Sequence, residues 1–199
     1  MSEWWTYRLS DFLMFSPRTY WRLVERYNEE TWPIHVLALG VGALLLWLTA
    51  ARSERASRAV LPLLAGAWLW VGWAFHLRTY GEISLGARYM AAAFALQAAL
   101  LLARGLRRRR ADPGRPLTRR QAVGWAVAAA AVFLYPLGAL LTGRPWTQAE
   151  VFGAMPEPTA LATLGLLPAT GRTGRGALLV IPAASLAAGW ITLWLMHGQ

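Results

Sequence analysis

The chain has 199 residues, of which 56% are hydrophobic and only 15% charged; a soluble globule of this composition would expose much apolar surface to water, so a polytopic membrane protein is favoured. The formal net charge of +10 comes entirely from Arg, most of it between apolar runs, which indicates membrane topology and excludes nucleic acid as the preferred partner. Cys is absent, which excludes thiol nucleophiles, disulfides, iron–sulfur clusters and covalently attached haem.

The first 32 residues carry many aromatic and charged side chains. Ser16-Pro17-Arg18 places an N-cap residue before a Pro at the first helical position, which is a helix start signal. The apolar face of the following helix would consist of Tyr20, Leu23, Val24 and Tyr27. This pattern predicts an amphipathic helix in the plane of the membrane interface, or a simple anchor for the first span. We therefore expect a periplasmic or interfacial segment at 1–32 and a transmembrane domain at 33–199.

Apolar runs that are long enough to cross a bilayer lie at 33–51, 59–77, 85–103, 121–141 and 177–196. A further segment at 158–170 is short, and the stretch 151–168 contains three Pro and one Glu. We expect a half-helix with an irregular start buried among its neighbours, because non-helical backbone survives at membrane depth only where protein or water covers it. The predicted fold is all-α, a polytopic membrane helix bundle of about six transmembrane helices plus the N-terminal interfacial helix. A re-entrant 158–170 segment would leave five crossings.

The distribution of charge predicts the orientation. The loops at 52–58, 104–120 and 172–175 hold 13 Arg and two acidic residues, whereas 1–32, 78–88 and 144–157 hold seven Arg and eight acidic residues. By the positive-inside rule the first set is cytoplasmic, which places both termini in the periplasm. The Arg104–Arg120 run then acts as a stop-transfer cluster that contacts anionic lipid headgroups and not nucleic acid.

The polar link between the second and third apolar runs holds His76, Arg78 and Glu82. A charged group in hydrocarbon costs from about 3 to more than 10 kcal/mol depending on the scale, so these groups should lie at one membrane face or in a wet cavity beside it. The topology places Glu157 in the same layer. We predict that His76, Glu82 and Glu157 approach one another near the periplasmic face, beside Asn28 and Trp32.

The candidate ligand-binding residues are therefore His76, Arg78, Glu82, Gln97, Glu157, Asn28 and Trp32. Gln97 is the only amide deep inside an apolar run, although such a residue more often forms an interhelical hydrogen bond worth about 1 kcal/mol. The histidines His35, His76 and His197 share one level, and a divalent metal or a b-type haem would need the helices to bring them together. Hydration among the headgroups explains His35 and His197 more simply. His76 is the stronger candidate, because Arg78 and Glu82 follow it directly and can set its protonation state. We predict no cofactor, and the absence of a phosphate loop, GxSxG or HExxH ranks an enzyme last.

Several short words of the sequence form a recognisable set, namely Arg26-Tyr27-Asn28, Trp32-Pro33, the 70–76 segment, Phe94, Gln97, Phe152-Gly153, Pro156, Pro158 and Thr159. On these residues most of the chain resembles an uncharacterised family of bacterial six-span membrane proteins, classed as a domain of unknown function and sometimes labelled a transporter permease. The family motif reads Phe-Gly-x-x-Pro-Cys-Pro-Thr, and Glu157 stands at the Cys position here, which puts in doubt any thiol or metal role tied to that Cys. The resemblance implies a bacterial inner-membrane architecture and no particular activity.

Two functions stay open. The Pro-rich segment at 151–168 favours a permease-like carrier of small solutes, because discontinuous helices line the substrate sites of many carriers. Six short spans would need a homodimer to enclose a path, and the sequence does not identify the small-molecule ligand. The long N-terminal segment favours the alternative, a non-transporting sensor, assembly factor or accessory subunit that binds a partner at the periplasmic face.

Overall fold

The computed structural model describes residues 15–51, 53–106, 118–170 and 176–197, and the regular structure in these ranges is entirely helical. In chain order the elements are α1 (Pro17–Glu30), α2 (Ile34–Ala51), α3 (Glu54–Trp70), η3 (Val71–Thr79), η4 (Tyr80–Glu82), α4 (Ala87–Leu106), α5 (Arg119–Phe133), η5 (Tyr135–Leu137), α6 (Gly138–Leu141), η6 (Trp146–Gln148), α7 (Pro156–Ala169) and α8 (Gly176–His197). Of these, η3 is a π-helix, whereas η4, η5 and η6 are single turns of 3-10 helix.

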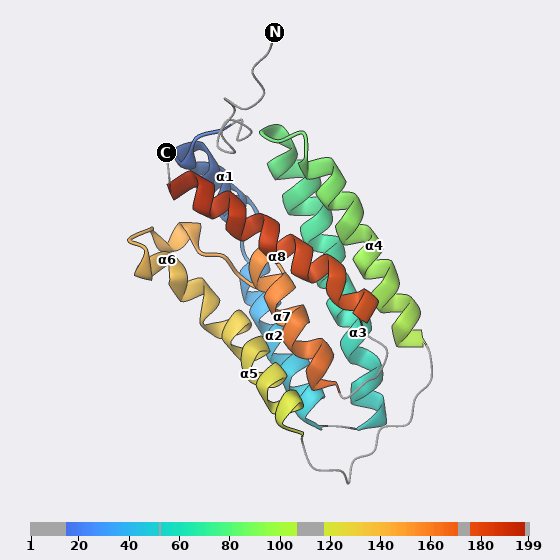
Figure 1. Ribbon diagram of the computed structural model, residues 1–199. Coiled ribbons are helices and arrows are strands. Elements are labelled where there is room, and N and C mark those ends of the chain that lie inside the picture. The colour runs from blue at the N-terminus through green and yellow to red at the C-terminus, as the bar shows by residue number, and fades with distance from the viewer. Residues whose placement is uncertain (1–14, 52, 107–117, 171–175, 198–199) are drawn as a thin grey trace.

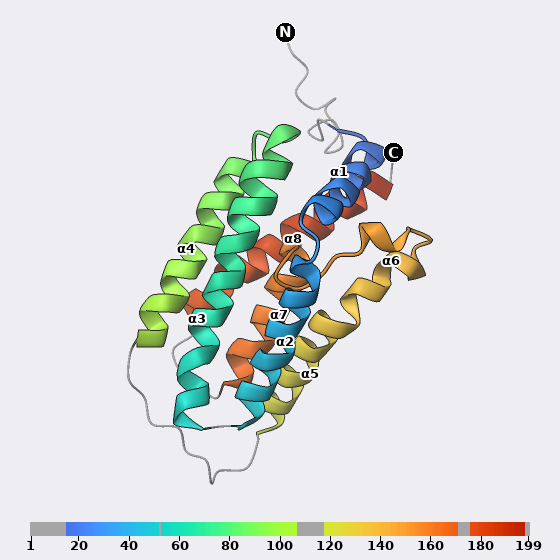
Figure 2. The ribbon, with the colours of Figure 1, turned by 180° about the vertical axis from the view of Figure 1, so that it is seen from behind.

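The helices form an elongated bundle, shown from two sides in Figures 1 and 2. α2, α3, α4 and α5 run along its length, α8 crosses them obliquely, and α7 lies among them. α1 and the turn after η3 lie at one end, which we name the α1 end. α8 also finishes at the α1 end, whereas α2 finishes and α5 begins at the opposite end.

The predicted N-terminal helix is confirmed in its start and in its apolar face. The Ser16 hydroxyl accepts a hydrogen bond from the Thr19 backbone N–H at 3.2 Å, and Pro17 occupies the first turn. The predicted face is buried, namely Tyr20, Leu23, Val24 and Tyr27. Protein covers this face, because α1 packs against η6 and η3. The helix is therefore folded onto the bundle, a contact that its own periodicity did not show.

Three described segments are long and apolar enough to cross a membrane, namely Ile34–Ala51, Arg58–Glu82 and Gly176–Met196. A fourth is added if α5 and the η5–α6 segment form one span, which is bent by 44°. Pro136 lies at this bend and lacks the N–H that a continuous helix would use.

The expectation of six spans is therefore not supported by length and composition. α4, at the expected span 85–103, is rich in Ala and carries Arg88 and Arg104 near its ends. α7, at the expected span 158–170, has only 14 residues, which is about 21 Å of helix against a hydrocarbon core about 30 Å thick.

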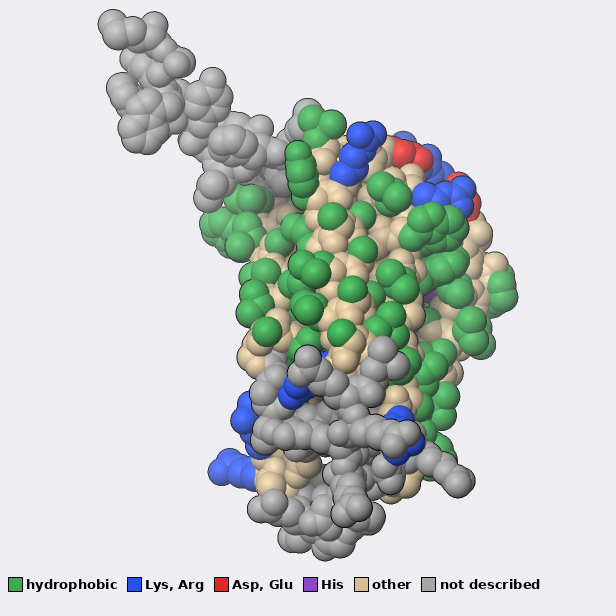
Figure 3. Space-filling view, turned by 90° about the vertical axis from the view of Figure 1, so that its right-hand side faces the viewer, with side chains coloured by type: hydrophobic (Ala, Val, Ile, Leu, Met, Phe, Trp, Pro, Cys, Tyr) green, Lys and Arg blue, Asp and Glu red, His purple; other side chains and the backbone are tan. Residues whose placement is uncertain are grey.

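One face of the bundle carries a broad band of hydrophobic side chains between charged side chains near its two ends (Figure 3). The exposed apolar side chains of α3, η3, α4 and their connections include Leu69, Trp73, Leu77, Leu85, Tyr89, Leu96 and Leu102. A soluble monomer rarely exposes so large an apolar surface. The surface is compatible with insertion into a membrane.

α7 lies in the interior, and 11 of its 14 residues are buried. It packs most extensively against α5. Gly124 and Gly165 let the two backbones approach closely, since a Cβ on Gly124 would lie 2.6 Å from the Gly165 carbonyl oxygen. Small residues permit such close contacts in membrane bundles. The buried half-helix and its non-helical start have the form expected for 151–168.

Candidate functional site

The chain enters the interior through the non-helical segment 149–155, all of which is buried, and this segment leads directly into α7. Gly153 has a φ of +75°, which favours Gly, and a Cβ there would lie 3.2 Å from the Ala38 side chain. The Gly153 N–H donates to the Thr159 hydroxyl at 2.8 Å, and this hydroxyl donates to the Met155 carbonyl at 2.6 Å. The first turn of α7 thus satisfies backbone groups of the segment before it. We name 149–159 the broken segment.

A chain of hydrogen bonds ties α7 to α3. The Thr163 hydroxyl donates to the Thr159 carbonyl at 2.7 Å and accepts from the Trp68 indole N–H at 2.9 Å. Trp68 is fully buried and packs on Phe94 of α4, with 4.2 Å between the ring centroids. These contacts fix the rotation of α7 relative to α3 and α4.

The last turn of α1 holds the start of the broken segment. The Asn28 amide nitrogen donates to the carbonyls of Thr147 at 2.8 Å and Ala149 at 3.0 Å. Its amide oxygen lies 3.0 Å from His35 Nε2 of α2, which donates to it. Asn28 and His35 are both buried, so their polar atoms depend on these bonds. Trp32, exposed beside them, stacks on His35 with 6.3 Å between the ring centroids.

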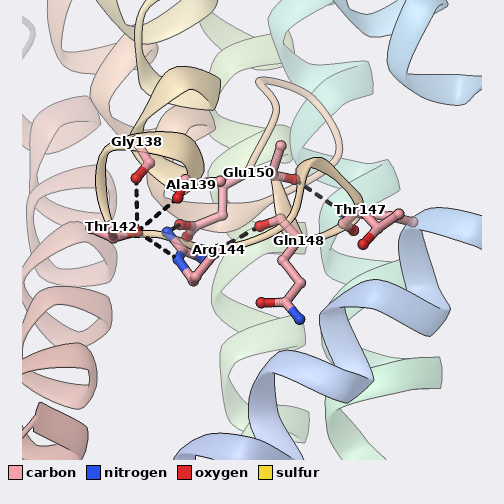
Figure 4. Close-up of polar contacts among 9 residues, drawn as sticks. Gly138, Ala139, Thr142, Arg144, Thr147, Gln148 and Glu150 are labelled. Atoms are coloured by element: carbon pink, nitrogen blue, oxygen red, sulfur yellow. Dashed lines mark hydrogen bonds and ion pairs between the residues drawn. The ribbon is translucent and has the colours of Figure 1, made fainter.

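Arg144 is the centre of a polar cluster next to the broken segment (Figure 4). Its guanidinium binds Glu150 at 3.2 Å and donates to the Thr142 hydroxyl at 2.9 Å and the Gln148 carbonyl at 3.4 Å. The ring of Trp21 covers it, with 3.6 Å from Cζ to the ring centroid. Burial raises the pKa of the Glu150 carboxyl above its ordinary value, and the charge of Arg144 offsets only part of this rise.

Glu157 is the second residue of α7, and only 5% of it is exposed. Its carboxyl group lies against Gly189 of α8, where a Cβ would come within 2.8 Å of Cδ. The negative charges of Glu150 and Glu157 repel each other. Oε2 of Glu157 and Oε1 of Glu150 have no hydrogen-bond partner in the described part of the chain. A carboxylate in this position is costly, which makes Glu157 a candidate functional group.

A half-open groove of about 590 Å³ lies between α1, α2 and η3. Its apolar walls include Leu37, Trp70 and Trp73, and polar side chains from α1, η3 and η4 complete its lining. Tyr27 also lines the groove, and its hydroxyl donates to the Ala154 carbonyl at 3.0 Å. The groove and the broken segment therefore share one side chain.

The groove is bordered by an ion pair and by the π-helix. Arg26 of α1 binds Glu82 of η4, and this hydrogen bond raises the pKa of Arg26. Arg78 lies over Trp73, with 5.0 Å from Cζ to the ring centroid, and both residues belong to η3. π-Helical turns are rare and occur frequently at functional sites.

The structure brings the predicted site residues together only in part. Arg78 and Glu82 line the groove, whereas Glu157 is not among the residues that line it. The Glu82 side chain is 52% exposed and bound to Arg26, whereas Glu157 is buried against Gly189. The prediction assumed one wet layer for both carboxyl groups, and a partner from distant α1 keeps Glu82 at the surface instead.

His76 and Gln97 lie apart from the groove lining. His76 is buried against Phe94, with 4.6 Å between the ring centroids, and neither of its ring nitrogens has a hydrogen-bond partner among the described residues. Gln97 donates to the Leu178 carbonyl of α8 at 3.0 Å, which is the interhelical hydrogen bond given as its alternative role.

The described ranges contain no group of three His, Cys, Asp or Glu side chains that could hold a metal ion. The side chain of His197 and residues 107–117 of the Arg104–Arg120 run lie outside the described part of the chain.

Sequence reasoning did not select Tyr27, Arg144, Glu150 or Gly189 as site residues. Arg144 and Glu150 are six residues apart in one polar stretch, which was a usable signal for a local ion pair. The contact of Gly189 with Glu157 joins two helices whose local sequences carry no sign of it.

A comparison with known families matches residues 18–194 to a family of unknown function, DUF6064. Comparisons with curated proteins and with solved structures give no match. The matched range includes the groove, the broken segment and nearly all of α1 and α8. The chain therefore belongs to the DUF6064 family of unknown function.

Proposed function

We propose that this protein is a multi-pass protein of a bacterial inner membrane that carries a small solute. Three or four apolar helices and the hydrophobic band support insertion. In this proposal α4 and α7 complete six crossings, and the Arg-rich end faces the cytoplasm. A reporter fused at Gln199 tests the orientation, because activity of a reporter that works only in the cytoplasm would contradict it.

The observation that carries the proposed transport is the contact between the groove and the broken segment at Tyr27. Carriers place their substrates where helices are discontinuous, since backbone without helical hydrogen bonds can offer polar groups to a substrate. Here the discontinuity is the buried segment 149–155, and the side chain of Tyr27 lies between it and the groove.

The groove suits a small solute with an apolar body and a polar or charged tip. The indole rings of Trp70 and Trp73 offer apolar surface, while Arg78 and Glu30 offer charges of opposite sign. The volume of about 590 Å³ lies within the usual range for small-molecule sites, roughly 300 to 1,000 Å³.

Purified protein in liposomes tests this function with a panel of labelled amphipathic solutes. Arg78→Gln should weaken uptake and remove the thermal stabilisation that a bound solute gives. Arg88→Gln is the matched control, because Arg88 is exposed on α4 and does not line the groove. Failure of every solute to move or bind, or equal behaviour of the two variants, would contradict the proposal.

A non-transporting accessory role is the second candidate, and the packing of α1 limits it. The apolar face of α1 is already buried against the bundle, so a partner would contact its polar face, which includes Arg22, Glu29 and Glu30. Recovery of one fixed partner without any solute uptake would favour this role.

We also propose that the protein forms a homodimer. A monomeric mass in detergent and in lipid would contradict this proposal.

A further inference from the structure

Glu157 is enclosed on every side that the structure describes. Gly189 of α8 lies against its carboxyl group, and Pro156 and Pro158 flank it in α7. Its charge acts on Glu150 and on three tyrosines from other elements, Tyr20 of α1, Tyr80 of η4 and Tyr135 of η5. Arg144 is the cation that belongs to this group of side chains.

Arg144 is already committed to other partners. Its guanidinium binds Glu150, Thr142 and Gln148 and lies under the ring of Trp21. The charge of Glu150 balances that of Arg144, which leaves Glu157 without a counter-ion among the described residues. Oε2 of Glu157 also has no hydrogen-bond partner there.

An ionised carboxyl group in this position would be a buried charge without a counter-ion among the described residues. Such a charge costs several kcal/mol, and proteins usually avoid the cost by neutralising the group. We infer that Glu157 is a proton-binding site, at which the carboxylate takes up one proton to form the neutral acid and later releases it. The coupling of this proton to solute movement rests on the proposed function, whereas proton binding itself does not.

Infrared spectroscopy of the purified protein tests proton binding without any solute. The wild type should show the C=O band of a protonated carboxylic acid at neutral pH, and Glu157→Gln should remove it. Glu29→Gln is the matched control, because Glu29 is exposed on α1 and lies outside the groove. Absence of the band in the wild type, or its persistence in Glu157→Gln, would overturn the inference.

Glu150→Gln gives a second test that does not need the Glu157 variant to fold. This change removes the neighbouring negative charge and frees Arg144 for Glu157. The pH at which the wild-type band is half lost should therefore fall by roughly one to three units. An unchanged midpoint would overturn the assignment to Glu157.

Vesicles with an imposed pH gradient test the coupling. Glu157→Gln should keep downhill exchange of a solute that the wild type carries but lose its accumulation against a gradient, whereas Glu29→Gln should keep both. Accumulation by Glu157→Gln would overturn the coupling. A protein that shows the titrating band but moves no solute would refute the proposed carrier function and leave the proton site supported.

Discussion

Arg144 lies over the ring of Trp21, with 3.6 Å between Cζ and the ring centroid, and at the same time binds the buried carboxyl group of Glu150. Trp21 belongs to α1, whereas Glu150 belongs to the broken segment. The Arg144 guanidinium therefore links α1 to the broken segment. Arg suits this position because its planar group can stack and form several hydrogen bonds at once.

We expect Arg144→Ala to lower the free energy of unfolding by roughly 3 to 5 kcal/mol, because it leaves the Glu150 carboxyl buried without its partner. Arg144→Lys should restore only part of the loss, since Lys keeps the charge but not the planar stack. Thermal unfolding in detergent measures both effects, with Arg88→Ala as the control. An Arg144→Ala variant as stable as the control would contradict the role of the cluster.

Stability should also depend on pH through Glu150. Its pKa is raised in the folded protein, so above the ordinary value of 4.5 the folded chain retains a proton that the unfolded chain releases. Stability should therefore fall as the pH rises from about 4.5 through the raised value. Unfolding curves at a series of pH values should be flatter for Glu150→Gln than for the wild type or Glu29→Gln. A slope of opposite sign in the wild type would refute the expectation.

The contact of α5 with α7 gives a prediction about a single methyl group. A Cβ on Gly124 would lie 2.6 Å from the Gly165 carbonyl oxygen, so Gly124→Ala must push the two helices apart. We expect a loss of about 1 to 3 kcal/mol in the free energy of unfolding. A Cβ on Gly40 of α2 would meet no side chain and no neighbouring helix within 4 Å, and Gly40→Ala should stabilise the helix by up to about 1 kcal/mol. Chemical unfolding in detergent measures the change in the free energy of unfolding for both variants. If Gly124→Ala were stabilising like Gly40→Ala, the close packing of α5 on α7 would be contradicted.

The hydrogen bond from Trp68 to Thr163 predicts the effect of an almost isosteric change. Thr163→Val removes the hydroxyl and leaves the buried indole N–H without its partner, which should cost about 1 to 3 kcal/mol. Thr192→Val is the control, because the Thr192 hydroxyl donates to the Ala188 carbonyl of its own helix. The indole fluorescence and the unfolding temperature should change in the first variant and stay near wild type in the second.

Much of the helical architecture could be predicted from the sequence. The Ser16-Pro17 start signal and the apolar face of α1 are observed, and α2 and α8 begin within one residue of the expected spans. The bend near Pro136 also had a signal, because Pro in a long apolar run interrupts helical hydrogen bonds. The π-helical form of η3 had no signal in the sequence, since no residue pattern distinguishes its hydrogen bonds from those of an α-helix.

The site was harder to predict, and the reason lies in the composition of the spans. α2 and α8 are apolar on nearly all faces, so their periodicity does not show which side meets a neighbour. Glu82 is bound by Arg26 of α1, and Glu157 is in contact with Gly189 of α8, so both contacts join segments that are distant in the sequence. The rotation of each helix about its own axis decides these contacts, and this rotation cannot be predicted from a single sequence whose helices are apolar on all faces.

The contact between Gly189 and Glu157 also restricts how the family can vary. A Cβ at position 189 would overlap the space that Cγ and Cδ of Glu157 occupy, at 2.8 Å from each. The two positions should therefore covary among relatives, with Glu at the first requiring Gly at the second. A residue smaller than Glu at position 157 would leave room for Ala at position 189. We therefore expect the crossing of α7 and α8 to act as a pairwise constraint, which an alignment of relatives would test.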